Sequence, residues 1–243
     1  MIELGFILVS AFLLLIFTIW KRKSPAKFRE ITAFARLYQA IGLSVEDGTR
    51  LHISLGRGDL LTSRGASGLA GLSFVRDISQ RTSVSDSPLI ATAGDPVLSL
   101  LAQDTIRAGY DAAGVGDLFP PNSGRLAGMS PFGYAAGVMP IVDDENVSAN
   151  VLIGNFGAEI GLLAESAERE RALTVAASDD LTAQAVLYVS AQEPLIGEET
   201  FAAGAYLGMG NSHTASLTVQ DILRWLVILF LLAGSGLKIL GVF

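Results

Sequence analysis

The chain has 243 residues, of which 50% are hydrophobic, and a formal net charge of −7. It has no cysteine, which excludes disulfides, thiol nucleophiles, iron–sulfur clusters and zinc–thiolate sites. A Schiff-base enzyme and a Walker-type phosphate loop both need a lysine, so the middle of the chain can form neither. The four lysines all lie near the ends of the chain: Lys21, Lys23, Lys27 and Lys238.

The middle of the chain is acidic. Between Glu30 and Gln220, ten arginines and 22 acidic residues give a net charge of −12, so nucleic acid is not an expected partner. The two histidines, His52 and His213, have no histidine neighbour, and no metal or other cofactor is predicted. We expect His52 on a solvated strand face and His213 in an exposed linker, since neither has a nameable acid–base partner.

Residues 1–20 are apolar apart from Glu3. A helix of about 20 residues rises roughly 30 Å, the thickness of a bilayer's hydrocarbon core. The alternatives are a cleaved signal peptide and an uncleaved transmembrane helix. The segment lacks a preceding basic region and a small-residue cleavage site, and it ends in Trp20 followed by basic residues, which favours the transmembrane helix.

A basic cluster follows this first apolar segment. Positively charged flanks stay in the cytoplasm, so the amino terminus is expected outside and the middle domain in the cytoplasm. Residues 21–42 are predicted to form a basic juxtamembrane segment with an amphipathic helix. That helix lies either on the membrane face or, as we favour, in the folded domain. The predicted interface residues are Trp20, Lys21, Arg22, Lys23, Lys27 and Arg29.

A second apolar segment spans residues 221–243. Arg224 and Trp225 suit the inner interface, and Lys238 can reach the outer one. A buried core helix is the alternative, which the length of the segment and its place at the end of the chain disfavour. The sequence thus predicts a two-pass inner-membrane protein with both termini outside. The small residues at 233–236 suit a helix–helix contact, or reflect the tolerance of glycine in membrane helices.

Between these segments, residues 43–209 are predicted to form a cytoplasmic α/β domain. Four short apolar runs each lead through Gly or Asp into a helical stretch, which is typical of a mostly parallel sheet covered by helices. The four units pair into two β-α-β-α halves. The predicted strands are 50–55, 89–94, 149–154 and 173–177, and the helices run to about 80, about 113, 171 and about 192.

The connector at 114–148 is open to two interpretations. Residues 133–142 suit a strand that would form a hairpin and make the sheet mixed, whereas 131–139 suit a short helix. After Pro194, a helix is expected at 198–207, followed by a polar linker at 210–220 that leads to the second apolar segment.

Glycines and polar residues follow the predicted strands. Ligands of parallel sheets bind at the carboxyl ends of strands, near helix N-termini. A phosphate-binding G-x-G-x-x-G motif is incomplete, because position 61 is Leu61. Asp59, Asp95 and Asp179 suit helix caps, with a divalent-cation site as the alternative. The candidate ligand residues are Gly56, Gly58, Asp59, Gly94, Asp95, Asn155, Gly157, Asp179 and Asp180.

Two stretches, 36–42 (RLYQAIG) and 46–51 (EDGTRL), precede the α/β core. Together with the flanking apolar segments they resemble an uncharacterised bacterial membrane protein family, a domain of unknown function with two spans around an α/β domain. The resemblance covers nearly the whole chain. It implies no activity and no functional residues.

No catalytic set is recognisable in the sequence, and we lean towards a protein that is not an enzyme. We expect a membrane-anchored scaffold that self-associates or joins a larger membrane complex. The alternative is a membrane-tethered domain, either a binding module or an enzyme, that binds a nucleotide, phosphate or divalent cation through the Gly- and Asp-rich strand ends.

Overall fold

A computed structural model describes residues 2–21, 29–62, 64–206 and 211–239. The chain divides into two compact units. Unit 1 comprises Met1–Arg29 and Gly204–Phe243, and unit 2 comprises Glu30–Ala203. Each unit is described by itself.

Unit 2 is built on a six-stranded sheet in which every neighbouring pair of strands is parallel. The strand order is β3-β2-β1-β4-β5-β6, so the chain starts in the middle of the sheet, builds outward to one edge, and then returns to build the other. The register places His52 opposite both Ile90 and Asn150. The strands are β1 (Arg50–Gly56), β2 (Ile90–Ala93), β3 (Gly124–Leu126), β4 (Val147–Asn155), β5 (Leu173–Ser178) and β6 (Glu193–Leu195).

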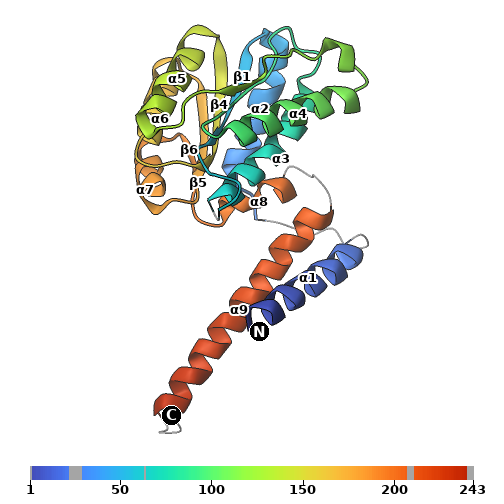
Figure 1. The fold of residues 1–243 in the computed structure, drawn as a ribbon, viewed down its shortest axis with the longest axis vertical. Helices are drawn as coiled ribbons and strands as arrows, with labels where there is room; N and C mark the ends of the chain where they lie inside the picture. The colour runs from blue at the N-terminus through green and yellow to red at the C-terminus, as the bar shows by residue number, and fades with distance from the viewer. Residues whose placement is uncertain (1, 22–28, 63, 207–210, 240–243) are drawn as a thin grey trace. The chain divides into compact units, whose positions relative to one another are not determined.

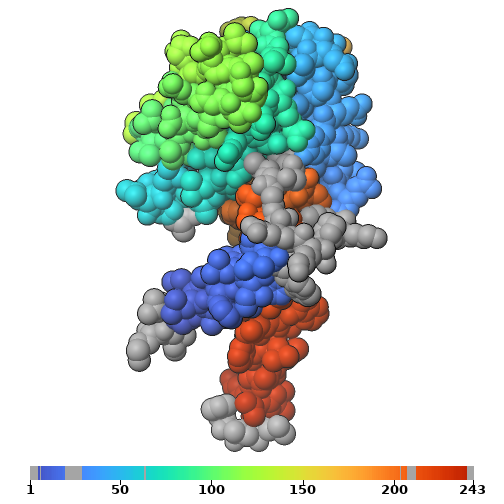
Figure 2. All heavy atoms as spheres, turned by 90° about the vertical axis from the view of Figure 1, so that its right-hand side faces the viewer, coloured from blue at the N-terminus to red at the C-terminus, as the bar shows by residue number. Residues whose placement is uncertain are grey.

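Helices cover both faces of the sheet, three on each (Figure 1). One face carries α2 (Thr32–Asp47), α3 (Gly65–Arg81) and α4 (Pro96–Ala112), and the other carries α5 (Pro131–Asp144), α6 (Ile160–Arg169) and α7 (Leu181–Ser190). In Figure 2, α2 (blue) and the segment that contains α3 and α4 (cyan to green) share one surface of unit 2. The predicted α/β class is therefore confirmed. The remaining elements of unit 2 are a short 3-10 helix, Gly116–Leu118, and the start of α8 (Glu199–Tyr206).

Helix α2 belongs to unit 2, the placement that we favoured for it. Its buried side chains recur every three or four residues, as on one face of a helix. Phe34 stacks on Phe74 of α3 with ring centroids 6.2 Å apart. The helix ends at Gly48, which adopts the left-handed conformation (φ +64°) common just after a helix.

The connector forms a helix, and the predicted hairpin at 133–142 is wrong. Residues 131–144 form α5, so the alternative prediction of a helix at 131–139 is the better one. Two local signals start this helix: Ser130 accepts a hydrogen bond from the Gly133 amide, and Pro131 occupies the first turn. The apolar residues that suggested a strand bury one side of α5 instead, and the sheet stays parallel.

The core follows from strands that are buried on both faces. Every residue of β2 is buried, as are six of the seven residues of β1. A glycine in α3 allows close packing on the sheet. A Cβ on Gly71 would lie 2.6 Å from Leu55 Cδ2 and 2.7 Å from the Ile153 oxygen, so α3 approaches the sheet where a side chain would not fit.

Unit 1 contains two apolar helices, α1 (Ile2–Lys21) and α9 (Asn211–Ile239), which pack against each other. Among the described residues, one helical segment, Ser212–Ile239, is long and apolar enough to cross a membrane. The apolar stretch of α1, Ile7–Ile19, falls short of that length. The predicted amino-terminal span therefore lacks the support that the carboxy-terminal one has.

Residues 211–220 were predicted to be a linker but form the first turns of α9, since a helix can begin in a polar stretch and continue into an apolar one. Of the predicted interface residues, Arg29, Arg224 and Trp225 are exposed. Lys238 lies in the last turn of α9. Trp20 and Lys21 end α1, whereas Arg22, Lys23 and Lys27 lie outside the described residues.

Candidate functional site

The predicted ligand residues lie at one edge of the sheet, where the parallel strands end. β1 ends at Gly56 and β4 ends at Asn155. These two strands are neighbours, yet the chain leaves them towards opposite edges of the sheet. In doubly wound α/β sheets of this strand order, the crevice at such a switch point is where ligands bind.

Two glycines allow the loop after β1 to fold tightly over this point. Gly56 has φ +70°, and a Cβ there would collide with the backbone oxygen of Asn155. A Cβ on Gly58 would collide with the carbonyl oxygen of Arg64 at the far end of the same loop. The Arg57 amide donates a hydrogen bond to the Asn155 oxygen, which extends the β1–β4 pairing by one residue. The glycines therefore shape the loop rather than form a complete phosphate-binding motif.

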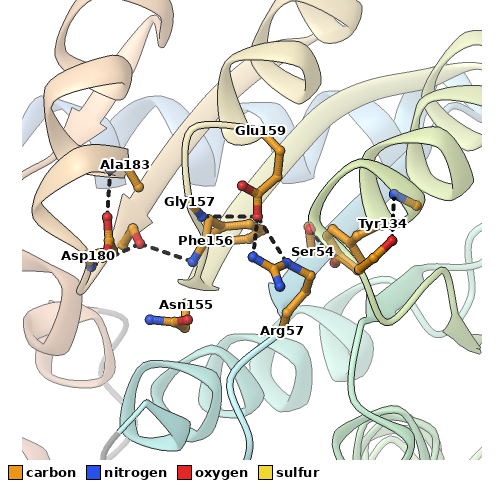
Figure 3. Close-up of polar contacts among 12 residues, drawn as sticks. Ser54, Arg57, Tyr134, Asn155, Phe156, Gly157, Glu159, Asp180 and Ala183 are labelled. Carbon is orange, nitrogen blue, oxygen red and sulfur yellow. Dashed lines mark hydrogen bonds and ion pairs between the residues drawn. The ribbon is translucent and has the colours of Figure 1, made fainter.

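An arginine–glutamate pair joins the loops after β1 and β4 (Figure 3). Arg57 Nη2 lies 2.8 Å from Glu159 Oε1 and Arg57 Nε lies 3.0 Å from it. The Glu159 side chain is only 3% exposed and that of Arg57 is 20% exposed. Burial raises the pKa of Glu159, but hydrogen bonds from the Gly157 and Glu159 amides and the charge of Arg57 outweigh it and lower the pKa.

Carboxylates of the chain itself cap two of the helices that begin at this edge. Asp95 accepts a hydrogen bond from the Leu98 amide at the start of α4, and Asp180 accepts from Thr182 and Ala183 at the start of α7 (Figure 3). Ahead of α6, the Gly157 amide donates to Glu159 Oε1. A phosphate would have to displace these carboxylates. Among the described helices of this edge, α3 and α6 begin without a side-chain cap, at Arg64 and Glu159.

A cavity of about 330 Å³ lies beside the start of α3. Two arginines and one aspartate line it, and because Arg57 is paired with Glu159, Arg64 is the lining cation that has no salt bridge among the described residues. Asp59 is partly engaged, because its Oδ1 accepts a hydrogen bond from the Leu61 amide. The cavity suits a small anion better than a cation. Its lining residues are Arg57, Asp59, Thr62, Arg64 and Asn155.

The aspartates predicted as caps have different roles. Asp95 does cap α4. The cap of α7 is Asp180 rather than Asp179, because Asp179 Oδ1 accepts a hydrogen bond of 2.7 Å from Asn155 Nδ2. Asp59 closes a turn and does not cap α3. Three charged residues of the site were not predicted from the sequence: Arg57, Arg64 and Glu159. Two arginines in one glycine-containing loop after a strand were a usable signal for the first two.

His52 is buried, and the prediction of a solvated face is wrong. Its Nδ1 lies 2.7 Å from Asn150 Oδ1 and its Nε2 lies 2.9 Å from Thr92 Oγ1. Thr92 in turn lies 3.2 Å from the Tyr134 hydroxyl, which is 2.6 Å from Ser54 Oγ. Burial lowers the pKa of His52 to about 4, although the hydrogen bond with Asn150 raises it. This polar chain runs beneath α5 and cross-links the two halves of the sheet.

His213 lies in the first turns of α9 and not in a linker. A Cβ on Gly204 would meet its imidazole ring, so the ring packs closely on that glycine. No group of three or more histidines and carboxylates that could hold a metal ion occurs within the described part of the chain. The divalent-cation alternative therefore gains no support from side-chain clustering there.

The strand order and switch-point cavity define a doubly wound α/β protein with an apolar helical unit. The chain belongs to the family described as a domain of unknown function, DUF6754, whose model matches residues 1–243. The resemblance to an uncharacterised family is thereby confirmed. No curated protein and no solved structure matches the chain.

Proposed function

We propose that the chain is a non-enzymatic, membrane-tethered protein whose unit 2 assembles with copies of itself or with a larger membrane complex. The observation that carries this proposal is a contact between the first helix and the last strand of unit 2. Thr32, where α2 begins, donates a hydrogen bond of 3.2 Å to Glu193 of β6, the last strand. Arg36 lies 2.7 Å from the same carboxylate. These two contacts hold the first helix of unit 2 against its last strand, so the chain segment that follows the first apolar helix is fixed to an edge strand of the domain.

The membrane arrangement in this proposal is two-pass, with both termini outside and unit 2 on the cytoplasmic side of a bacterial inner membrane. The basic residues that follow α1 support this orientation, because they are retained in the cytoplasm. Protease added outside intact cells should leave unit 2 uncut. Cleavage within residues 30–203 under those conditions would show that unit 2 lies outside the cytoplasm and would contradict the proposed orientation.

Self-association is supported by surfaces that stay open within the described chain. Gly234 and Gly236 of α9 have no described atom within 4 Å of a built Cβ, so the small-residue stretch does not serve the α1–α9 contact. In unit 2, the charge-free helix α7 exposes Leu181, Tyr188 and Val189. Exposed apolar faces of this kind are typical of interaction sites.

Crosslinking in native membranes and mass photometry in mild detergent test the assembly. We expect a discrete oligomer from the wild-type chain. Gly234→Ile with Gly236→Ile should weaken it if the small residues form the contact, while Leu229→Ile on the same helix serves as a control that should leave it intact. A strictly monomeric protein that retains no partner in either measurement would overturn the proposal.

A second candidate function is the binding of a small anion at the switch point. The cavity lined by Arg57 and Arg64 beside the uncapped start of α3 favours it. A thermal-shift series with phosphate, nucleotides and divalent cations tests it, because a ligand that binds only the folded state raises its stability. Arg64→Gln should abolish the shift, whereas Arg76→Gln, elsewhere on α3, should not. The absence of a shift with every probe would eliminate this candidate.

A further inference from the structure

A second cavity lies at the opposite edge of the sheet, where the parallel strands begin. Its volume is about 420 Å³, within the range of roughly 300–1,000 Å³ that is usual for small-molecule sites. One wall comes from α2 and includes Leu43 and Asp47. The other comes from the starts of β4 and β5 and includes Ser148 and Leu173. None of its lining residues belongs to the switch-point cavity.

The cavity is lined by two guanidinium groups and one carboxylate. Arg36, Arg171 and Asp47 give a formal charge of +1 (two minus one). Arg36 forms an ion pair with Glu193 through Nη1, which leaves further N–H groups of its planar fork to donate. Arg171 has no salt bridge in the described ranges. Paired arginine donors of this kind match the oxygens of a phosphate or carboxylate group.

The backbone at Arg171 is the second, independent observation. Arg171 follows the end of α6 with φ +57°, in the left-handed region. Its amide donates to the Glu168 oxygen, and the Ala172 amide donates to the Ala167 oxygen, which close the helix end. Glycine is the usual residue at this position because a Cβ is disfavoured there. The chain has an arginine instead, and that side chain lines the cavity.

We infer that this cavity binds a phosphate ester, with the phosphate held by Arg171 and Arg36 and the organic part against Leu43 and Leu173. The volume exceeds the needs of a bare phosphate ion, and the apolar wall suits a short carbon chain. Such a group occurs on a phospholipid headgroup and on a soluble phosphomonoester. The lipid source rests on the proposed membrane tether, whereas phosphate binding itself does not.

The test separates binding from stability. The full chain is reconstituted in nanodiscs of a neutral glycolipid, whose headgroup carries no phosphate, and glycerol 3-phosphate is titrated by calorimetry. Arg171→Gly removes the guanidinium and also relieves the left-handed backbone. We expect it to bind about tenfold more weakly, as for the loss of one charge-assisted hydrogen bond, and to unfold at a higher temperature than the wild type.

A matched control exists at Asn146, the other described non-glycine residue with positive φ (+53°). Asn146→Gly should also raise the unfolding temperature, but it should leave glycerol 3-phosphate affinity within about twofold, because Asn146 does not line the cavity. Arg171→Lys keeps the charge and loses the fork, so it should bind with intermediate affinity.

Nanodiscs that contain phosphatidylglycerol distinguish the two sources. If the ligand is a lipid headgroup, glycerol 3-phosphate affinity falls in these nanodiscs, and native mass spectrometry finds the lipid retained by the wild type but not by Arg171→Gly. If the ligand is soluble, affinity is equal in both nanodiscs. Either result supports the site. Wild-type-like binding by Arg171→Gly, or no binding of either phosphate source by the wild type, overturns it, whatever the oligomeric state.

Discussion

The two halves of unit 2 follow the same β-α-β-α-β plan but differ where ligands would bind. In the first half, a loop of residues 57–64 separates β1 from α3, and it carries two arginines. In the second half, the short loop 156–159 leads directly from β4 to α6, and Glu159 closes it by accepting the Gly157 amide. Loop length and one buried carboxylate, not the fold, therefore make the two halves unequal.

The contact that joins the two loops should show the largest effect. Glu159→Ala leaves the Arg57 charge half-buried without its partner, and we expect a loss of about 4 kcal/mol in the free energy of unfolding. Hydrogen exchange of β1 and β4 peptides in urea measures it in the full chain. Asp77→Ala, at the exposed Arg81–Asp77 pair, should cost under about 1 kcal/mol; equal losses would show that the loop pair is not special.

The polar chain beneath α5 should make unit 2 sensitive to acid. The pKa of His52 is about 4 in the folded state, against an ordinary value of 6.5. As the pH falls, the unfolded state therefore binds the proton before the folded state does. The neutral imidazole contributes fully to the free energy of unfolding above pH 6.5. This contribution, about 3 kcal/mol in total, is lost as the pH falls towards 4. The slope of stability between pH 6.5 and 4 should be smaller in His52→Gln than in the wild type. Parallel slopes would contradict the buried neutral imidazole.

The helices that follow the first strand of each half offer a matched pair of glycines. Gly71→Ala in α3 would force a Cβ against backbone and core, and we expect a loss of about 2 kcal/mol. Gly161→Ala in α6 would meet only Val186 Cγ1, at 3.0 Å, so the gain in helix propensity of up to about 1 kcal/mol should offset the contact. Thermal unfolding of both variants checks the difference. Similar losses would show that both helices pack equally closely.

The capping aspartates should give the smallest effects. Asp180→Ala removes the acceptor for two amides of α7 and should cost about 1 kcal/mol. Asp59→Ala, in the first half, removes only a turn contact and should cost under about 0.5 kcal/mol. Hydrogen exchange at the starts of α7 and α3 compares them. A larger loss at Asp59 would mean that the loop after β1 depends on that carboxylate.

Local sequence patterns were sufficient to predict much of the fold and part of the candidate site. Asp95 followed by Pro96 is a typical helix start and marks the beginning of α4. The apolar runs that form β1 and β4 predicted buried parallel strands. The prediction of a strand in the connector was wrong because the apolar residues between Gly133 and Val142 suit either a strand or a helix. Ser130 and Pro131 favour the helix, because they form its N-terminal cap and first turn. This signal lies at the start of the segment and not in the apolar run itself.

By itself the sequence determined the class of protein: apolar segments at both ends, a buried α/β core between them, and neither cysteine nor, in that core, lysine, because composition and periodicity are local properties. Only the tertiary structure decided which residues meet. It buried His52 between Asn150 and Thr92, paired Arg57 with Glu159, and brought Arg171 and Arg36 to the lining of one cavity. Such contacts depend on strand order and register, which bring together residues that lie far apart in the chain.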